Sequence, residues 1–492
     1  MTLCIREINI LQEYGVRMSN DVTAPFDSKQ RRVEEGLIPE PTLRSVGLPR
    51  ASVAERMALY HVPGMSVAVI ADGRIEWAAG YGRLEPEGGR PVDEHTLFQA
   101  CSISKPVTTL AVLSLVQAGV LDLDRDVNEY LRSWSVPANG DWQPVVTLRA
   151  LLSHAAGTTV HGFPGYRRGD HVPTLLQVLD GEPPANTRPV CVNAAPGLGF
   201  RYSGGGICIV QQVLSDATGS AFPDLMRELV LSSLGMDDST FEQPLPESRW
   251  ADAALGCTSD GAAVAGGWHT HPEAAAAGLW TTPSDLARVA LEVQRTRRDG
   301  SGAVLTQESV NAMLERQNDG PVGLGFFVVG SDGHLHFMHG GDNVGYKCEL
   351  VAFADHGLGM VVMTNGDEGW QLCMETTRAI AHEYEWPLPV TATQQYYSYR
   401  RSPVQLHREV YRSYTGEFEL RPGLSAVVEL EDDDLTITFP GQPTIPLCAQ
   451  TSGEYYAEVV DLEAAFSRDE MGAVAGVTLR QGGLQFVASK IA

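Results

Sequence analysis

Strand-forming segments stand at both ends of one long region of the chain, and this distribution constrains the fold most. Residues 66–82 alternate in hydrophobicity around Asp72-Gly73, a two-residue turn typical of a β-hairpin. A second series of strand segments with turns rich in Gly and Asp spans residues 322–365. Between them lie short helices and loops rich in Gly and Pro. We therefore predict an α+β fold in which both strand groups form one antiparallel sheet, flanked by helices and accompanied by a helical subdomain.

The C-terminal part of the chain predicts a second, smaller domain. Residues 391–410 are polar and irregular, as expected of a linker, and short strands separated by turns fill residues 411–492. This spacing predicts a small all-β barrel. The main domain is expected at residues 49–390, and residues 1–48 form a polar N-terminal extension with a short helical segment near its residues 30–35.

The charge balance excludes several kinds of partner. Acidic side chains number 61 against 36 basic ones, which gives a formal net charge of −25. Because this charge repels phosphate backbones and anionic lipids, we expect neither nucleic acid nor a membrane as partner. Arg6, Glu7 and Glu13 stand where a signal peptide needs an unbroken apolar stretch, and the apolar helix candidate 106–121 is too short to span a bilayer. We predict a cytoplasmic protein, with the oligomeric state unknown and translation starting at Met1 or Met18.

The sequence offers little evidence for a metal site. The eight cysteines are scattered, without a Cys-x-x-Cys pair. His269 and His271, with Glu273 close by, are the strongest candidates, but they stand in a loop rich in Gly and Ala with no further ligand nearby. We interpret them as structural and predict no metal and no cofactor.

One lysine follows a serine at the spacing of a helical turn. Ser102-Ile103-Ser104-Lys105 opens a segment whose apolar residues recur at helical intervals, and Gly119 is placed to end that helix. Side chains at positions i and i+3 share one helix face, so the amine of Lys105 can reach the hydroxyl of Ser102. A serine activated in this way is a candidate nucleophile. The alternative is a capping serine with a solvated lysine.

Two later segments carry further candidates. Tyr202-Ser203-Gly204 precedes an apolar helix, in a loop that can hold a phenol in a cleft. His339-Gly340-Gly341 ends a strand, where two small residues let a substrate approach the backbone. Taken singly, each segment is also compatible with an ordinary turn.

Together and in this order, the three segments resemble the motifs of the serine β-lactamase and penicillin-binding-protein-like family. The similarity is to its class C-type branch, which includes D-aminopeptidases, β-lactamase-fold carboxylesterases and acyl-transfer enzymes. It covers about residues 50–385 and includes LLSHAAG and AAAGLWTTPSDLA. The segment from Tyr414 to Ile491 resembles the lipocalin-like barrel of some members, which shapes the cleft entrance, holds an acyl chain or only stabilises the protein.

The resemblance implies a role for each motif residue. Ser102 would be the nucleophile, Lys105 its base, and Tyr202 the proton relay to the leaving group. The backbone N–H groups of Ser102 and Asp342 would form the oxyanion hole, next to Gly340 and Gly341. His339 would line the cleft.

Two departures from the family pattern bear on the substrate. Gly204 replaces the usual Asn, and His339 replaces the usual Lys, which argues against an efficient β-lactamase. We expect a serine hydrolase that cleaves an ester or amide in a small-molecule or peptide acyl substrate. The alternatives are an acyltransferase or peptide-cyclising thioesterase with an amine or alcohol acceptor, and a non-catalytic sensor or binding protein.

Overall fold

The computed structural model describes residues 28–39, 50–387 and 406–491, apart from internal gaps of one to four residues. It divides into two compact units. Met1–Glu35 and Ser52–Ile380 belong to the first, and Gly36–Ala51 and Ala381–Ala492 belong to the second. Most of the predicted extension and linker lies outside the described residues. The short helix expected near residue 30 is present as α2, Lys29–Glu34.

A six-stranded antiparallel sheet is the centre of the first unit, in the order β2-β1-β10-β9-β8-β7. The pairing of β1 with β10 joins the two strand groups, which confirms the predicted sheet. At the hairpin between β1 and β2, Asp72 and Gly73 have φ values of 50° and 70°, as a tight turn of this type requires. The strands are β1 Gly64–Ala71, β2 Arg74–Gly82, β7 Phe327–Val329, β8 His336–Asn343, β9 Tyr346–Phe353 and β10 Gly359–Thr364.

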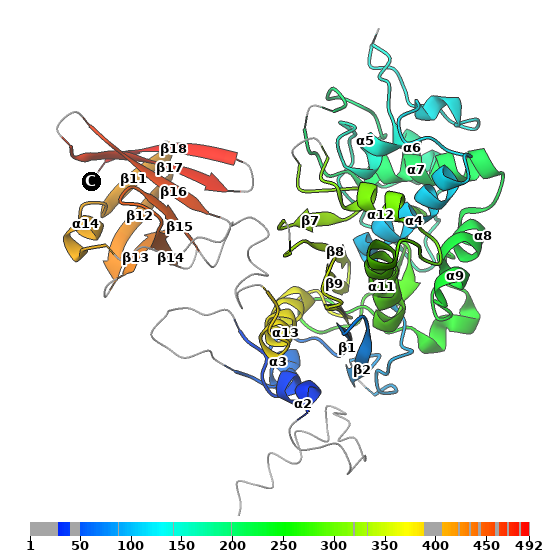
Figure 1. The fold of residues 1–492 in the computed structure, drawn as a ribbon, viewed down its shortest axis with the longest axis horizontal. Coiled ribbons are helices and arrows are strands. Elements are labelled where there is room, and N and C mark those ends of the chain that lie inside the picture. Colours follow the sequence, from blue (N-terminus) through cyan, green and yellow to red (C-terminus); the bar gives the residue numbers. More distant parts are fainter. Residues whose placement is uncertain are drawn as a thin grey trace, which may run out of the picture. The chain divides into compact units, whose positions relative to one another are not determined.

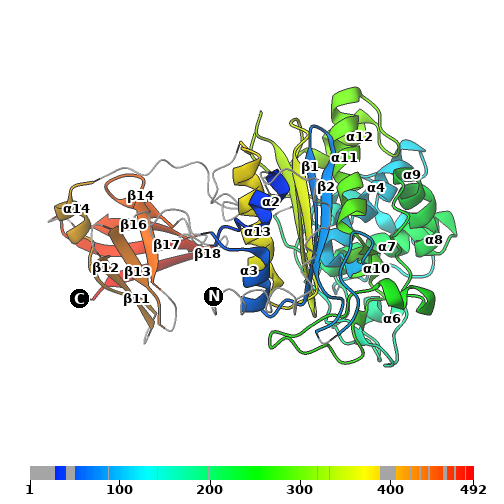
Figure 2. The same cartoon turned by 90° about the horizontal axis from the view of Figure 1, so that it is seen from below.

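Helices cover both faces of this sheet (Figures 1 and 2). One face carries α3 (Val53–Leu59) and α13 (Gly369–Glu383), and the other carries α11 (Pro283–Asp299) and the helical subdomain. The further helices are α5 Leu148–Leu152, α6 Leu175–Asp180, α7 Gly204–Thr218, α8 Phe222–Met226, α9 Ser232–Leu234, α10 Ala274–Ala277 and α12 Gln307–Leu314. Short strand pairs join β3 (Phe98–Gln99) to β6 (Trp280–Thr281) and β4 (Tyr166–Arg167) to β5 (His269–Thr270).

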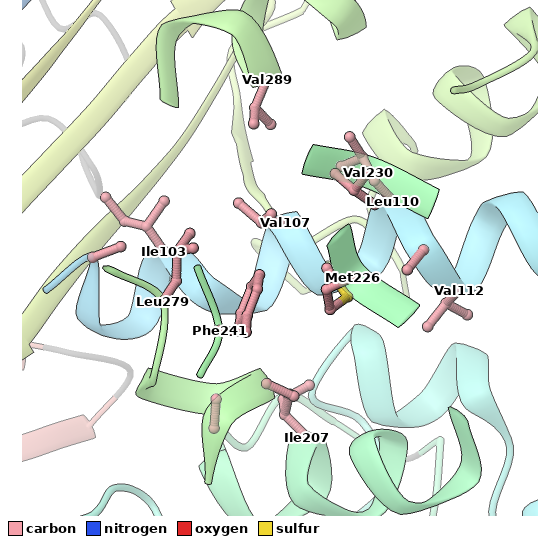
Figure 3. Close-up of a cluster of buried hydrophobic side chains, with 14 of the residues drawn as sticks. Ile103, Val107, Leu110, Val112, Ile207, Met226, Val230, Phe241, Leu279 and Val289 are labelled. Atoms are coloured by element: carbon pink, nitrogen blue, oxygen red, sulfur yellow. The ribbon is translucent and has the colours of Figure 1, made fainter. Parts of the chain in front are cut away.

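Helix α4 (Ser104–Gln117) passes through the core of the first unit. All of its residues from Ser104 to Leu113 are buried, because other elements pack around the helix on every side. Figure 3 shows Val107 and Leu110 of this helix surrounded by buried side chains from other elements, among them Met226, Phe241 and Val289. The helix ends before Gly119, whose φ of 71° confirms the predicted stop.

The second unit contains a closed antiparallel barrel, which confirms the predicted all-β domain. Buried and exposed residues alternate along its strands: in β12, Ala426 and Val428 face the interior while Val427 and Glu429 face outward. The sequence did not indicate β14 or β16 as separate strands. The elements are α14 Arg408–Arg412, β11 Gly416–Arg421, β12 Leu424–Glu431, β13 Asp434–Thr438, β14 Ile445–Ala449, β15 Glu454–Tyr456, β16 Glu463–Arg468, β17 Val474–Gln481 and β18 Leu484–Lys490.

None of the helices that the structure describes has both the length and the apolar character needed to cross a membrane.

Candidate active site

Ser102 lies in a tight turn, the 3₁₀ helix Cys101–Ile103, directly before α4. Cys101 adopts a left-handed backbone conformation with φ of 51°, which is uncommon for a residue with a side chain. The turn is fixed by Leu279, whose carbonyl oxygen accepts from Ala100 N at 2.8 Å and whose N–H donates to Ser104 Oγ at 3.1 Å. The position of the Ser102 backbone is therefore set by the segment that precedes β6.

Lys105 is buried and its amine reaches Ser102, as the i, i+3 spacing predicts. Nζ donates to Ser102 Oγ at 2.9 Å and to the carbonyl oxygen of Ala276 in α10 at 2.7 Å. It also lies 5.1 Å from the ring centre of Tyr202. The sequence did not predict Ala276 as an acceptor, because a residue of any type can supply a backbone carbonyl oxygen. Only the place of Ala276 in the AAAGLWTT segment pointed to this region.

Tyr202 is positioned by the start of α7. Ser203 caps this helix: its Oγ accepts from Gly206 N at 3.0 Å and donates to Thr159 O at 2.6 Å. The ring of His154 packs 4.4 Å from that of Tyr202, and its Nδ1 accepts from Ser203 N at 3.2 Å. The hydrogen bond places the ring proton of neutral His154 on Nε2.

The histidines next to Lys105 are neutral. Burial, together with the charge of Lys105, lowers the pKa of His154 well below its ordinary value. The same two causes lower the pKa of His339 to about 3. Two uncharged imidazoles therefore flank the lysine amine and the Tyr202 ring.

At Gly204, where the family resemblance led us to expect Asn, the structure leaves no room for a larger residue. A Cβ atom at this position would lie 2.8 Å from Phe163 Cε2 and 3.2 Å from the carbonyl oxygen of His161. The Phe163 ring packs where a longer side chain would begin. This departure from the family pattern is thus built into the packing around α7.

Strand β8 presents a partly free edge beside Ser102. Among the described residues, β7 pairs only with positions 336–338 of β8, so positions 339–343 have a strand neighbour on one side only. His339 is 2% exposed, and its Nδ1 donates to the carbonyl oxygen of Gly340 at 2.6 Å. Its ring centre is 6.3 Å from that of Tyr202.

The two glycines of β8 allow close packing on opposite faces of the strand. A Cβ atom at Gly341 would lie 2.5 Å from the carbonyl oxygen of Ala100 and 2.9 Å from Cys101 Cβ. At Gly340 it would lie 2.5 Å from the Trp370 ring. The strand therefore contacts the turn of Ser102 directly, and the structure brings all three motifs together.

Asp342 and Asn343 fix the end of β8. The Asp342 carboxylate is 3.0 Å from Lys347 Nζ on β9 and remains 66% exposed. The Asn343 amide donates to Gln99 Oε1 at 2.7 Å and to Ala277 O at 3.2 Å, which ties the strand to α10. Neither amide contact was predicted from the sequence.

His271 and Glu273 are both fully buried at the start of α10. His269, the other member of the sequence pair, turns to the carbonyl oxygen of Pro164, 2.8 Å from its Nδ1. Within the described ranges, no group of three or more His, Cys, Asp or Glu side chains is arranged to hold a metal ion.

Comparison with known proteins agrees with this geometry. The sequence model of the Beta-lactamase family matches residues 50–383, and that of a domain of unknown function (DUF3471) matches residues 400–489. Esterase EstB of Burkholderia gladioli is 32% identical over 192 residues, covering 37% of this chain and 48% of EstB. A D-aminopeptidase of Gluconobacter oxydans is 26% identical over 320 residues, covering 64% of this chain and 58% of the enzyme. The chain thus matches about half the length of these curated relatives.

The fold is also similar to solved structures. The crystal structure of SurE with D-Leu superposes with a TM-score of 0.54 at 22% identity, over 89% of this chain and 97% of SurE. At this identity the likeness concerns the fold alone. The family match covers more than half of the chain, and its relatives include an esterase and a D-aminopeptidase. The chain therefore belongs to the Beta-lactamase family of β-lactamase-fold, penicillin-binding-protein-like hydrolases.

Proposed function

We propose that this protein is a serine hydrolase that forms an acyl-enzyme at Ser102 and cleaves an ester or amide of a small molecule or short peptide. The observation that carries the proposal is the contact of 2.9 Å between Lys105 Nζ and Ser102 Oγ in a buried site. An amine at this distance is within reach of the hydroxyl proton as Oγ attacks a carbonyl carbon. The names of the esterase and D-aminopeptidase relatives support the ester or amide substrate class.

Each step then has a group of this chain assigned to it. Lys105 Nζ accepts the Ser102 proton while Oγ forms a bond to the acyl carbon, and it returns this proton to Oγ when water releases the acyl group. The backbone N–H groups of Ser102 and Asp342 stabilise the developing oxyanion, at the point where β8 meets the Ser102 turn. Tyr202, next to the Lys105 amine, passes a proton to the leaving group and later takes one from the water that releases the acyl group.

Active-site labelling tests the nucleophile. A fluorophosphonate probe or a chromogenic short-chain ester is expected to modify Ser102, with the adduct found by mass spectrometry of the tryptic peptide. Ser102→Ala should abolish labelling and turnover. Ser301→Ala is the control, because Ser301 is exposed and lies outside the three motifs. Turnover by Ser102→Ala equal to wild type would refute the proposal.

Product analysis with a competing amine tests the acceptor. With an activated ester and an added amine, a hydrolase releases mainly the free acid. Predominant amide formation would show that the same acyl-enzyme serves an acyltransferase, and would overturn the choice of water as acceptor.

A further inference from the structure

Glu273 and His271 form a buried polar pair that the proposed chemistry does not use. Both side chains are 0% exposed, and His271 Nδ1 lies 4.0 Å from Glu273 Oε2. Within the described residues, neither ring nitrogen of His271 and neither carboxyl oxygen of Glu273 has a hydrogen-bond partner from another residue. Buried polar groups in proteins are almost always hydrogen-bonded, to protein or to ordered water.

The separation of the two atoms has a simple geometric meaning. A distance of 4.0 Å is too long for a direct hydrogen bond. Two hydrogen bonds of about 2.8 Å that meet at one water oxygen at roughly 90–105° place their outer atoms about 4.0–4.4 Å apart. The observed distance lies in this range, and the pair offers both donors and acceptors to such a water.

The pair stands at the start of the segment that supplies the Lys105 acceptor. Two glutamines hold this segment at both ends: Gln211 of α7 bonds Pro272 O and Ala275 N, and Gln243 bonds His271 N and Gly278 O. Between these contacts, Ala276 O accepts from Lys105 Nζ. Any displacement of residues 271–278 therefore moves the Lys105 acceptor.

We propose that His271 and Glu273 bind one internal water molecule that bridges Nδ1 and Oε2, and that this hydrated pair is a positioning element for the Ala276 carbonyl and so for Lys105. The pair does not touch the substrate. Its effect on turnover rests on the proposed function of Lys105, whereas the water site itself does not.

The electrostatics around the pair agree with an uncharged water site. Burial raises the pKa of Glu273 to about 8, and burial with the nearby charges of His269 and Lys105 lowers that of His271 to about 3. The other titratable groups that act on Glu273 or share its surroundings are Tyr166 of β4 and Cys208 of α7, whose pKa values burial raises. At neutral pH the carboxyl group therefore carries its proton and donates one hydrogen bond. When the Glu273 carboxyl group ionises near pH 8, the buried carboxylate needs more hydrogen-bond donors than the single bridging water supplies.

Crystallography tests the water site without reference to catalysis. High-resolution crystals of wild type and of Ser102→Ala should both show one water within hydrogen-bond distance of His271 Nδ1 and Glu273 Oε2. A direct His271–Glu273 hydrogen bond, or no density between the two atoms, would overturn the proposal. If Ser102→Ala retains turnover, the proposed function fails while this result still decides the water site.

Kinetics test the positioning role. Glu273→Gln keeps a neutral hydrogen-bonding group and should stay within about 3-fold of wild-type kcat, whereas Glu273→Leu should lose about 10-fold or more with little change in KM. Glu242→Gln makes the same chemical change at an exposed carboxylate and should have no effect. Full activity of the Leu variant, or an equal loss in the Gln variant, would overturn the role.

The pH profile decides the case in which the Leu variant does not fold. Wild-type kcat should decline above pH about 8 as the Glu273 carboxyl ionises, and Glu273→Gln should lack this decline. Identical alkaline limbs for wild type, Glu273→Gln and Glu242→Gln would contradict the proposal.

Discussion

Lys105 combines burial with two hydrogen-bond acceptors, Ser102 Oγ and the Ala276 carbonyl oxygen. A carbonyl acceptor orients the amine without neutralising its charge, whereas a carboxylate would hold the proton on nitrogen. His154 and His339 beside the amine are uncharged, so they do not hold a proton on its nitrogen either. The residues around the amine thus leave it free to exchange a proton with Ser102.

Substitution tests Lys105 as the base. We predict that Lys105→Met lowers kcat/KM by about 100-fold or more, because the variant has no amine to accept the Ser102 proton. Stopped-flow acylation with a chromogenic ester measures the rate. A rate equal to that of wild type contradicts the role.

His161 is the control for this variant, since its ring also packs against Tyr202, 4.9 Å between centres. His161→Phe should keep most of the acylation rate. An equal loss in the two variants would show that packing around Tyr202, rather than the Lys105 amine, sets the rate.

Position 204 supports a second prediction at the scale of single residues. Gly204→Asn should lower the free energy of unfolding by about 1–3 kcal/mol, because the new Cβ lies against Phe163 and the His161 carbonyl group. In a protein that also carries Phe163→Ala, the destabilisation caused by Gly204→Asn should be smaller than in wild type. Urea unfolding measures both. Equal stability of Gly204→Asn and wild type would show that the Phe163 ring does not restrict this site.

At the scale of elements, α4 joins the core to the site, since it begins beside Ser102 and is buried over its first ten residues. Leu110→Ala should cost about 2–5 kcal/mol in free energy of unfolding, as expected for a buried leucine replaced by a cavity. Val120→Ala, just beyond the helix at a residue 44% exposed, should change stability by less than about 0.5 kcal/mol. Comparable losses in denaturant unfolding for the two variants would show that α4 does not carry the core.

The elements also show which parts of the site the sequence could predict. Ser102 and Lys105 were predictable because helical periodicity is local, and the β1–β2 hairpin because its turn needs particular residues. The carbonyl acceptor at Ala276 and the Asn343 contacts with Gln99 and Ala277 were not predictable. They join residues more than 60 positions apart and depend on tertiary packing rather than on side-chain pattern.

At the scale of the whole molecule, buried carboxyl groups couple stability to pH. Burial raises the pKa of Glu273 to about 8 and, with Asp238 nearby, that of Asp285 to about 6. Each folded pKa lies above the unfolded value, so the folded chain retains protons that the unfolded chain has already released. This contribution is full below the unfolded values near pH 4 and is lost as pH rises through 6 and then 8. The net charge of −25 adds self-repulsion in the same direction.

Below about pH 6.5 the lowered pKa values of the buried His154, His271 and His339 act in the opposite direction, because the unfolded chain binds protons there that the folded chain does not. We therefore predict that the free energy of unfolding falls as the pH is raised from about 7 to 8. Between pH 4 and 6, Asp285→Asn should change the pH dependence by at most about 3 kcal/mol relative to wild type, given about 1.4 kcal/mol per unit of pKa difference. Tryptophan fluorescence suits the measurement, since Trp386 is the one tryptophan of eight that lies in the second unit. A stability that rises between pH 7 and 8 contradicts the prediction.

The contact between Gly341 and the Ser102 turn limits how the active site can change. A side chain at position 341 would overlap the Ala100 carbonyl group and Cys101, where the backbone is already left-handed. In directed evolution, position 341 is thus expected to remain glycine, because a change at Cys101 would leave the contact with the Ala100 carbonyl group in place. Variation that alters the substrate range should accumulate instead on loops such as the one that carries Phe163, where a side chain can change without moving the nucleophile.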